Sequence, residues 1–564
     1  MICSHYSAEQ GDRYISPSST RVTIRNIVQR TIRHLPRVLV NTATGRLHDK
    51  AEQAAAFEAT PIFKELISSM TTRIDYVRIK REVRQFFRYV MLSHVLEENE
   101  PLFQHVVHIA VYDLDQSPTH EKLQMFCKIV RDAGFNWAWS ATCCINKADH
   151  VILEEARVNT FKWFQGSAMM IVFLFGVRSP SRRGDLVRSI WNTRAWTLQE
   201  YIASKVVRFY TEDWTPYLDL QLPNHKESPE VISEMEQATG VPAEQLMALR
   251  PGLSNIREKL RLASTRQATL VEDAAYSLFG VFSITDMHVI YGEGRSSLGR
   301  FLGHLLNVSG DARILAWTGQ SGSFNGCLPA HITVFNLPAT LHLPQPIPDA
   351  EMERMITALD SSSFDLDVAL KLYDRLNVLP APWCAARRMK LPCIAFQLPS
   401  FSRTGRAYRA DTVAFGALEI RTREDLSRAG SLYLVHPWLE AVMDRRGVQN
   451  SVVTEDDVAS PNTDDDEFYD DNTDDASSSL SGPESPSQPS PVHSMVPLDK
   501  ETRVRRLAAR LRQPFGALLV TQASTGRRGV DYRRVAADSL ITVRFQENVS
   551  LADILDNVRT LDVL

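Results

Sequence analysis

The chain has 564 residues, which is enough for roughly two to four domains with a sizeable hydrophobic core. Hydrophobic residues make up 44% and charged residues 23% of it, the ordinary balance of a soluble globular protein. The longest apolar run, residues 168–177, is too short for a membrane span, which needs about 20 residues. It therefore excludes a transmembrane segment and predicts a buried parallel strand.

The formal net charge of −4 conceals an uneven distribution. Residues 447–499 contain thirteen acidic side chains and no Lys or Arg, so the rest of the chain carries a formal charge of +9. A mildly basic folded part is compatible with anionic ligands but does not identify one. The acidic, Ser/Pro-rich stretch 448–495 lacks the apolar residues that a core needs, so we predict a disordered acidic loop there.

The seven cysteines are scattered along the chain, and none forms a CxxC pair. Cys143 and Cys144 are adjacent, a spacing that does not suit tetrahedral binding of one metal ion, and no metal site is expected. Either cysteine can pair with His94 as a nucleophile and base if their strands are neighbours, although a cysteine in a core strand is more often an inert hydrophobe. With no secretory signal at Met1, we expect reduced thiols and a cytoplasmic protein.

Residues 1–87 are predicted to form a helical N-terminal segment. Apolar residues recur at helical spacing over residues 20–35, with arginines elsewhere on the helix, until Pro36 breaks the pattern. Such a basic amphipathic helix can contact a membrane or direct import, but packing against the domain is the role we expect. A second helical stretch, residues 61–87, leads into the next element.

Strands and helices alternate over residues 88–215, which predicts an α/β domain. Strands are expected at residues 89–93, 137–144, 169–175 and 205–210, with helices at residues 153–164 and 191–204. Another helix is expected to begin after Ser117 as N-cap, with Pro118 in its first turn, and to end at Gly134. Alternation of this kind predicts a parallel sheet with right-handed crossovers, whose ligands bind at the carboxyl ends of the strands.

The most informative segment is residues 189–214, where a helical pattern passes into a short strand. It contains three tryptophans, which are costly to expose, so we predict a packed junction within a domain. Polar residues lie inside this core-like helix, namely Arg194, Gln199 and Glu200. We interpret Arg194 and Glu200 as groups that close the domain structurally.

This segment resembles the arginine, tryptophan and Thr-Leu-Gln-Glu signature that closes the fungal heterokaryon-incompatibility (HET) domain. Two earlier stretches resemble the other motifs of that family, in the family's order. Residues 88–94 (RYVMLSH) are similar to its opening strand, and residues 137–147 (WAWSATCCINK) are similar to its central motif. Residues 263–294 resemble the accessory segment that commonly follows the domain.

The resemblance implies a TIR-like (flavodoxin-like) domain and a role in vegetative incompatibility, non-self recognition and programmed cell death, a form of fungal innate immunity. Some TIR domains cleave the nicotinamide–ribose bond of NAD, a reaction that needs a carboxylate near the ribose. By this resemblance the catalytic candidates are Glu155, Glu154 and His94. The candidates for nucleotide binding are Ser93, Asn146 and Cys144. NAD would be the substrate, and no bound cofactor is expected.

The chain departs from the family pattern at positions that bear on this chemistry. Leu96 and Glu97 stand where the family has Trp-Gly. Carboxylates of the family pattern are replaced at Ala141, Asn146 and Ile152. These changes support an alternative, a non-enzymatic signalling or assembly module with a degenerate site. Its partners would be further copies of the chain or other incompatibility proteins.

The remainder of the chain changes character twice. Residues 216–310 have a helical pattern, and residues 311–447 and 496–564 are strand-rich. We predict a helical accessory segment and one β-rich C-terminal domain that the acidic loop interrupts; a linker to a separate small domain is the alternative. The arginine-rich stretches 503–512 and 527–534 lack interleaved aromatic residues apart from Tyr532, so nucleic acid is not an expected partner. The GxG at residues 292–294 lacks a P-loop lysine and predicts a turn.

Overall fold

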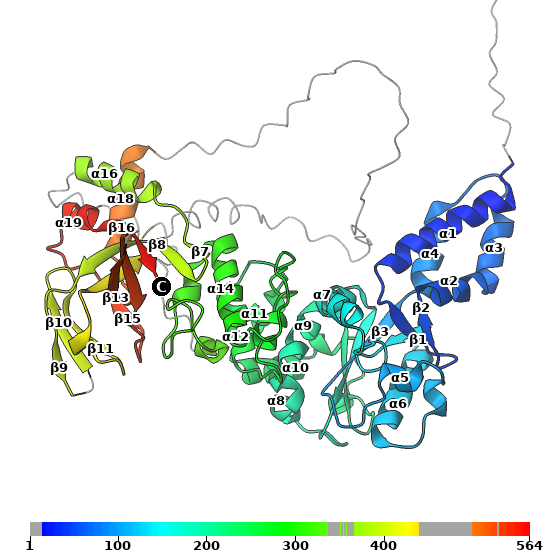
Figure 1. Cartoon of the computed structure of the whole chain (residues 1–564). Helices are drawn as coiled ribbons and strands as arrows, with labels where there is room; N and C mark the ends of the chain where they lie inside the picture. Colours follow the sequence, from blue (N-terminus) through cyan, green and yellow to red (C-terminus); the bar gives the residue numbers. More distant parts are fainter. Residues whose placement is uncertain are drawn as a thin grey trace, which may run out of the picture.

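The computed structural model describes residues 14–336, 366–405, 407–438, 499–526 and 529–564, together with residues 350, 354 and 357. Helices α1–α4 lie at one end of the molecule, the α/β sheet follows, and a helical part joins it to a β-rich part at the other end (Figure 1). Spatial order thus follows chain order. The predicted acidic loop at residues 448–495 lies outside the described residues.

The N-terminal part contains four helices, whereas the sequence predicted two helical stretches, at residues 20–35 and 61–87. They are α1 (Pro17–Arg33), α2 (Lys50–Glu58), α3 (Pro61–Ser69) and α4 (Tyr76–Phe86). Ser16 caps the start of helix α1, since its side chain accepts a hydrogen bond from the Ser19 amide. The buried face of α1 packs on the other three helices. The predicted single stretch at residues 61–87 is two helices, because Asp75 caps a new helix six residues after α3 ends.

A six-stranded sheet forms the centre of the first half, with the order β2-β1-β4-β3-β5-β6. Its strands are β1 (Val38–Asn41), β2 (Leu47–Asp49), β3 (Tyr89–His94), β4 (Trp137–Trp139), β5 (Met169–Leu174) and β6 (Val207–Thr211). The four strands β4, β3, β5 and β6 are parallel, which confirms the expected parallel sheet. The β1–β2 hairpin, which the sequence did not predict, adds an antiparallel edge.

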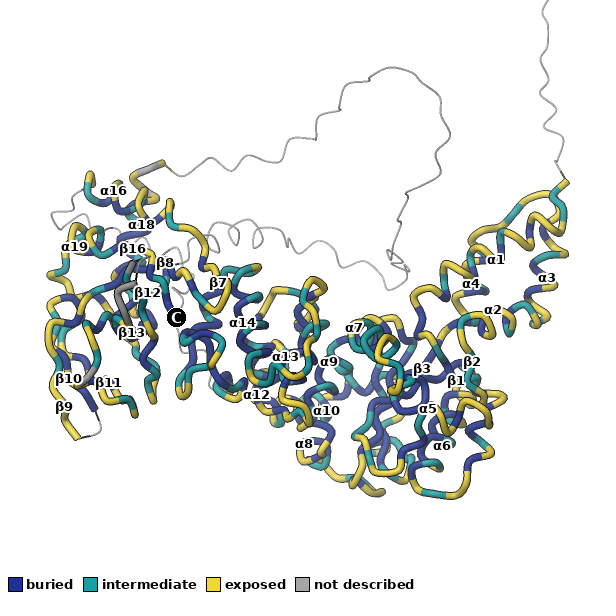
Figure 2. The backbone as a smooth tube through the Cα atoms, in the orientation of Figure 1, coloured by how far each residue is buried: buried dark blue, intermediate teal, exposed yellow. Residues whose placement is uncertain are grey.

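The strand order creates a switch point at β3. The chain passes from β3 to β4 on one side and then to β5 on the other, so the carboxyl ends of β3 and β5 flank the point where the winding reverses. Ligands of open α/β sheets bind at such points. Every residue of β5 is buried, and so is every residue of β3 except His94 at its end. The tube near β3 is mostly drawn in the dark blue of buried residues in Figure 2.

Helices cover both faces of this sheet. They include α5 (Phe103–Val106), α6 (Pro118–Asp132), α7 (His150–Gly166), α8 (Asp185–Arg188) and α9 (Ala195–Ala203). As predicted, Ser117 caps α6: its side chain accepts from the His120 amide, and Pro118 is the first helical residue. The local sequence signal was therefore sufficient for this helix.

Two predicted elements of this domain differ from the structure. The strand expected at residues 137–144 ends at Trp139, because the Cys144 amide turns back to donate to the Ser140 carbonyl at 2.9 Å. The helix expected at residues 191–204 is a 3₁₀ turn followed by α9, with extended backbone at Arg194. Arg194 is extended because its backbone pairs in parallel with Gln267, a contact that no local pattern reveals.

The second half begins with helices α10 (Pro229–Thr239), α11 (Ala243–Ala248), α12 (Ile256–Ser264), α13 (Asp273–Tyr276) and α14 (Ser296–Ser309), which confirms the helical pattern of residues 216–310. A β-rich part follows. Its helices are α16 (Leu366–Asn377), α18 (Lys500–Leu511) and α19 (Leu551–Asp556). Its strands are β7 (Trp383–Ala385), β8 (Arg388–Gln397), β9 (Ser402–Thr404), β10 (Ala407–Thr412), β11 (Gly416–Arg421), β12 (Leu432–Pro437), β13 (Phe515–Gly526), β14 (Gly529–Arg534), β15 (Ile541–Val543) and β16 (Val558–Val563).

The larger C-terminal sheet buries both of its faces. Strands β12, β13, β14, β16 and β8 pair in a ring, since β12 also pairs with β8. On β8, Leu391 and Cys393 pack into the core shared with the middle helices, whereas Ile394 belongs to a second core with α16, α18 and α19. Side chains alternate between the two faces of a strand, so one face of this sheet packs on the middle helices and joins the C-terminal part to the rest of the molecule.

Candidate functional site

A chain of three polar side chains lies at the carboxyl end of β3. The indole Nε1 of Trp191 donates to Ser93 Oγ at 2.8 Å, and the Ser93 hydroxyl donates to Glu200 Oε2. Ser93 comes from the strand, Trp191 from the turn before α9, and Glu200 from α9 itself. Because the indole occupies an acceptor position on Ser93, the hydroxyl proton is directed to the carboxylate.

Glu200 is placed where its protonation state is easily changed. Burial raises the pKa of Glu200 to about 7, although the Ser93 hydrogen bond and the charge of Arg266 act in the opposite direction. A carboxyl group with a pKa near neutrality can serve as a general acid or base. The sequence noted Glu200 as a polar residue within a core-like helix but interpreted it as structural closure.

Arg266 reaches this group from the segment that follows the α/β domain. Its Nη1 donates to Thr197 Oγ1 at 2.7 Å and to the Arg194 carbonyl at 3.0 Å. The guanidinium carbon lies 6.0 Å from the centroid of the Trp191 ring. The segment is held against α9 by a further bond, from Trp196 Nε1 to Asp273 Oδ2 at 3.0 Å. The junction predicted for residues 189–214 is therefore a contact between two parts of the chain.

His94 lies on the other face of the sheet from Ser93. Adjacent residues of a strand point to opposite faces. The Nε2 atom of His94 is 3.4 Å from Glu100 Oε1, and Lys122 Nζ of α6 donates to Glu100 and, at 2.6 Å, to Glu97. Burial lowers the pKa of His94. The two residues of the Ser-His pair thus belong to two separate polar clusters.

The two glutamates of α7 have partners elsewhere. Glu154 Oε1 accepts from Arg157 Nη1 at 3.0 Å, and that guanidinium lies 4.1 Å from the centroid of the Tyr291 ring. Glu155 Oε2 lies 3.4 Å from Arg37 Nη1. Glu154 therefore pairs with an arginine of its own helix, and Glu155 pairs with an arginine of the N-terminal part. Among the described residues, the polar contacts of these two glutamates do not include His94 or Ser93.

Asn146 and Cys144 lie in the turns after β4. The Asn146 side chain accepts from the Ala148 amide at 3.2 Å, a local bond that shapes the turn. Cys144 is buried with its Sγ 3.8 Å from Cys143 Sγ. The neighbouring thiol and burial raise the pKa of Cys143, which disfavours the reactive thiolate. Among the described residues, neither Asn146 nor Cys144 has a polar contact with Ser93 or Glu200.

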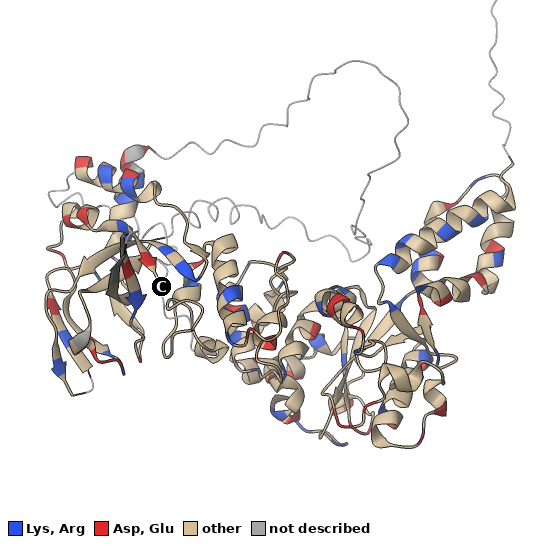
Figure 3. Cartoon of the chain, viewed as in Figure 1, with Lys and Arg blue, Asp and Glu red and all other residues tan. Residues whose placement is uncertain are grey.

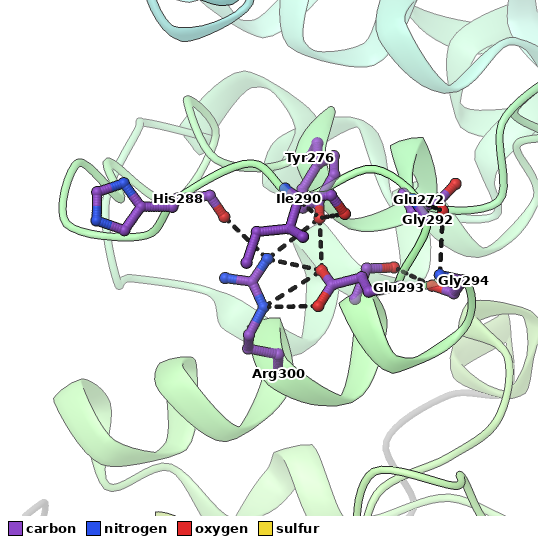
Figure 4. A network of polar contacts seen from close by, with 9 residues as sticks. Glu272, Tyr276, His288, Ile290, Gly292, Glu293, Gly294 and Arg300 are labelled. Atoms are coloured by element: carbon purple, nitrogen blue, oxygen red, sulfur yellow. Dashed lines mark hydrogen bonds and ion pairs between the residues drawn. The ribbon is translucent and has the colours of Figure 1, made fainter.

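The accessory motif around the GxG forms a closed network of polar contacts (Figure 4). Glu272 Oε1 accepts from the amides of Gly292 and Gly294, at 2.9 and 3.0 Å. Arg300 Nη2 donates to Glu293 Oε1 at 2.6 Å, and the Tyr276 hydroxyl donates to the same carboxylate. The predicted turn is confirmed, with φ of 95° at Gly292. These residues fix the loop that carries Tyr291 against α7.

Three general features limit the kind of site. Lys and Arg are interspersed with Asp and Glu over α1–α4 and over α16, α18 and α19 (Figure 3). No group of three metal-ligating side chains comes together within the described ranges. A search of the same residues finds no helix that combines the length and apolar character of a membrane span.

Comparison with known proteins gives one informative similarity. The vegetative incompatibility protein HET-E-1 of Podospora anserina is 29% identical to this chain over 221 residues. Part of the chain is related to a vegetative incompatibility protein. The alignment covers 37% of this chain and 15% of that protein, so the chain spans only a small share of its relative. No family model and no solved structure matches the chain.

Proposed function

We propose that the chain is a HET-type effector of vegetative incompatibility, in which the α/β domain and its accessory segment trigger programmed cell death. The observation that supports this most directly is the similarity to a vegetative incompatibility protein. The strand order β4-β3-β5-β6, which corresponds to the 2-1-3-4 winding of flavodoxin-like sheets, supports the TIR-like assignment. The expected partners are further copies of this chain or other incompatibility proteins.

We further propose that the effector reaction is cleavage of the nicotinamide–ribose bond of NAD, with Glu200 as the carboxylate. The geometry that supports Glu200 is its bond to Ser93 at the carboxyl end of β3, beside the switch point of the sheet. A carboxylate there would stabilise positive charge on the ribose as neutral nicotinamide departs, and it would accept the proton of the water molecule that then attacks the ribose. Catalytic roles for Glu154, Glu155 and His94, and nucleotide binding by Ser93, Asn146 and Cys144, stay predictions.

One experiment tests both proposals. The full chain is expressed from a regulated promoter in a filamentous fungus, and death of hyphal compartments is scored beside total NAD. The parent chain should kill cells and deplete NAD. Glu200→Gln should abolish both effects, whereas Glu154→Ala combined with Glu155→Ala should leave them intact. Purified parent chain incubated with NAD should release nicotinamide.

The second candidate function is a non-enzymatic signalling or assembly module. It is favoured by Ala141 and Asn146, which stand where the family carries carboxylates, and by the arginine partners of the α7 glutamates. In that case Glu200→Gln would still kill cells and NAD would stay constant. A chain that neither kills nor consumes NAD would contradict the incompatibility proposal itself.

A further inference from the structure

The indole of Trp191 occupies one side of the Ser93 hydroxyl group. Trp191 is 1% exposed, and its Nε1 donates to Ser93 Oγ at 2.8 Å. Ser93 is also 1% exposed, and within the described ranges its side-chain partners are Trp191 and Glu200. An indole N–H can only donate, so the Ser93 oxygen accepts from it. The hydroxyl proton is then left to point at Glu200 Oε2.

This arrangement favours one protonation state of Glu200. When Glu200 is ionised, each donor from the indole to the carboxylate has an acceptor. Protonation at Oε2 would place a second donor against Ser93 and leave the buried hydroxyl proton without its acceptor. Protonation at Oε1 would weaken the Ser93 bond, because a neutral oxygen accepts less strongly than a carboxylate. The contacts therefore favour the ionised form, which is the form that the proposed reaction needs.

Contacts on the other sides of Trp191 hold its ring in place. Thr197 Oγ1 donates to the Trp191 carbonyl at 2.8 Å. The ring packs edge-to-face on Phe209 of β6, with centroids 5.5 Å apart and planes at 89°. It packs in the same way on Tyr201 of α9, at 6.2 Å and 77°. The indole therefore has little freedom to turn, and its N–H stays directed at Ser93.

We propose that Trp191 is a positioning residue, whose indole N–H holds the Ser93 hydroxyl as a donor to Glu200. The catalytic part of Glu200 rests on the proposed function, but the hydrogen-bond chain from Trp191 to Glu200 is tested independently of it. The charged residue that acts on Glu200 from a neighbouring segment is Arg266, and a substitution of Trp191 leaves that charge in place. Loss of the indole N–H therefore changes the hydrogen bond alone.

The test is a titration of Glu200 in the full chain. The carbonyl band of its protonated carboxyl group is identified in infrared difference spectra as the band that Glu200→Gln removes, and it is followed against pH. Ser93→Ala should raise the midpoint by about one pH unit, because the carboxylate loses a donor. Trp191→Phe should raise it by about half a pH unit, because the Ser93 hydroxyl can then turn and accept from the protonated acid. The double variant should shift no further than Ser93→Ala, since Trp191 acts through Ser93.

The control is Trp196→Phe. Trp196 lies on α9 as well, but its Nε1 donates to Asp273 Oδ2 at 3.0 Å, so its loss should leave the Glu200 midpoint unchanged. A midpoint in Trp191→Phe equal to that of the parent chain would overturn the proposal. Equal upward shifts in Trp191→Phe and Trp196→Phe would overturn it too, because they would reflect a general loosening of the helix.

A second measurement decides if Trp191→Phe does not fold. The chain has nine tryptophans, and nitrogen-15 labelling makes their indole N–H groups visible by NMR. In the parent chain one of these signals should shift with the midpoint of Glu200, and Ser93→Ala should abolish that shift. Absence of such a signal would reject the proposal. Absence of NAD cleavage by the parent chain would count against the proposed function and would leave both titrations unaffected.

Discussion

Glu200 and Glu100 lie close to the carboxyl end of β3, but the pKa of Glu200 is raised and that of Glu100 is lowered, because their neighbours differ. Burial alone raises the pKa of a carboxyl group, and it does so for Glu200, which reaches about 7. Burial acts on Glu100 in the same direction, but contacts with His94 and Lys122 lower its pKa to about 2. Close cationic partners therefore keep Glu100 ionised as a structural carboxylate, whereas Glu200 can exchange its proton near neutrality.

The first prediction concerns Glu100. Its pKa in the folded chain lies below the ordinary value of 4.5, so the stability it contributes is present above that pH and is lost as the pH falls towards about 2. Glu100→Gln should lower the free energy of unfolding at pH 7 by about 3 kcal/mol and flatten the acid limb of the stability curve. Urea unfolding at a series of pH values measures both effects.

The matched control for this prediction is Glu97→Gln. Glu97 binds the same Lys122 ammonium, but its side chain is 21% exposed, compared with 5% for Glu100. Solvent screens the exposed carboxylate, so the control should lose less stability. Equal losses in the two variants, or an acid limb that Glu100→Gln does not change, would contradict the assignment.

At the scale of elements, the accessory segment and α7 pack at van der Waals contact. A Cβ atom at Gly280 would lie 2.3 Å from Cβ of Phe161 on α7. Both Cβ positions are fixed by the backbone, so rotation of a side chain cannot relieve this contact. The same helix carries Arg157 against Tyr291. Glycine at position 280 therefore allows the close approach on which the domain junction depends.

The second prediction is that Gly280→Ala destabilises the chain by about 1–3 kcal/mol, the usual range for overpacking a core. The measurement is the urea midpoint of the full chain. Gly166→Ala, at the end of α7, is the control, since its Cβ would meet only the Tyr89 hydroxyl at 3.3 Å. A Gly280→Ala variant as stable as Gly166→Ala would show that the junction is looser than described.

At the scale of the whole molecule, one buried arginine joins distant parts of the chain. Arg534, at the end of β14, donates to the carbonyls of Leu315, Trp317 and Cys327 at 2.8–3.2 Å. Its guanidinium carbon lies 3.8 Å from the centroid of the Trp317 ring. The planar fork of arginine suits several carbonyls at once, so this side chain fixes the C-terminal sheet against residues 311–336.

The third prediction is that Arg534→Met destabilises the chain by roughly 3 kcal/mol, because buried carbonyls lose their donors. The adjacent residue supplies the control. Arg533 is 47% exposed and pairs with Glu424 at 2.7 Å, so Arg533→Met should change the stability by less than about 1 kcal/mol. Thermal unfolding of the two variants beside the parent chain makes the comparison; similar transition temperatures would contradict it.

The sequence by itself determined the elements that depend on neighbouring residues. The apolar run at residues 168–177 predicted β5 because a strand buried on both faces needs continuous apolar side chains. Ser117 and Pro118 predicted the start of α6 because capping is a local hydrogen bond. The segment 189–214 likewise predicted a packed junction, and its three tryptophans lie at the contact with the accessory segment or with the end of β5.

Tertiary structure alone decided which residues form the candidate site. Ser93 and Glu200 are 107 positions apart, and Arg266 lies 69 positions from Thr197. The extended backbone at Arg194 and the pKa of Glu200 both depend on such distant contacts. A local pattern shows that Glu200 is a polar residue in a core-like helix, but its acidity is set by burial and by charges that only the folded chain brings near.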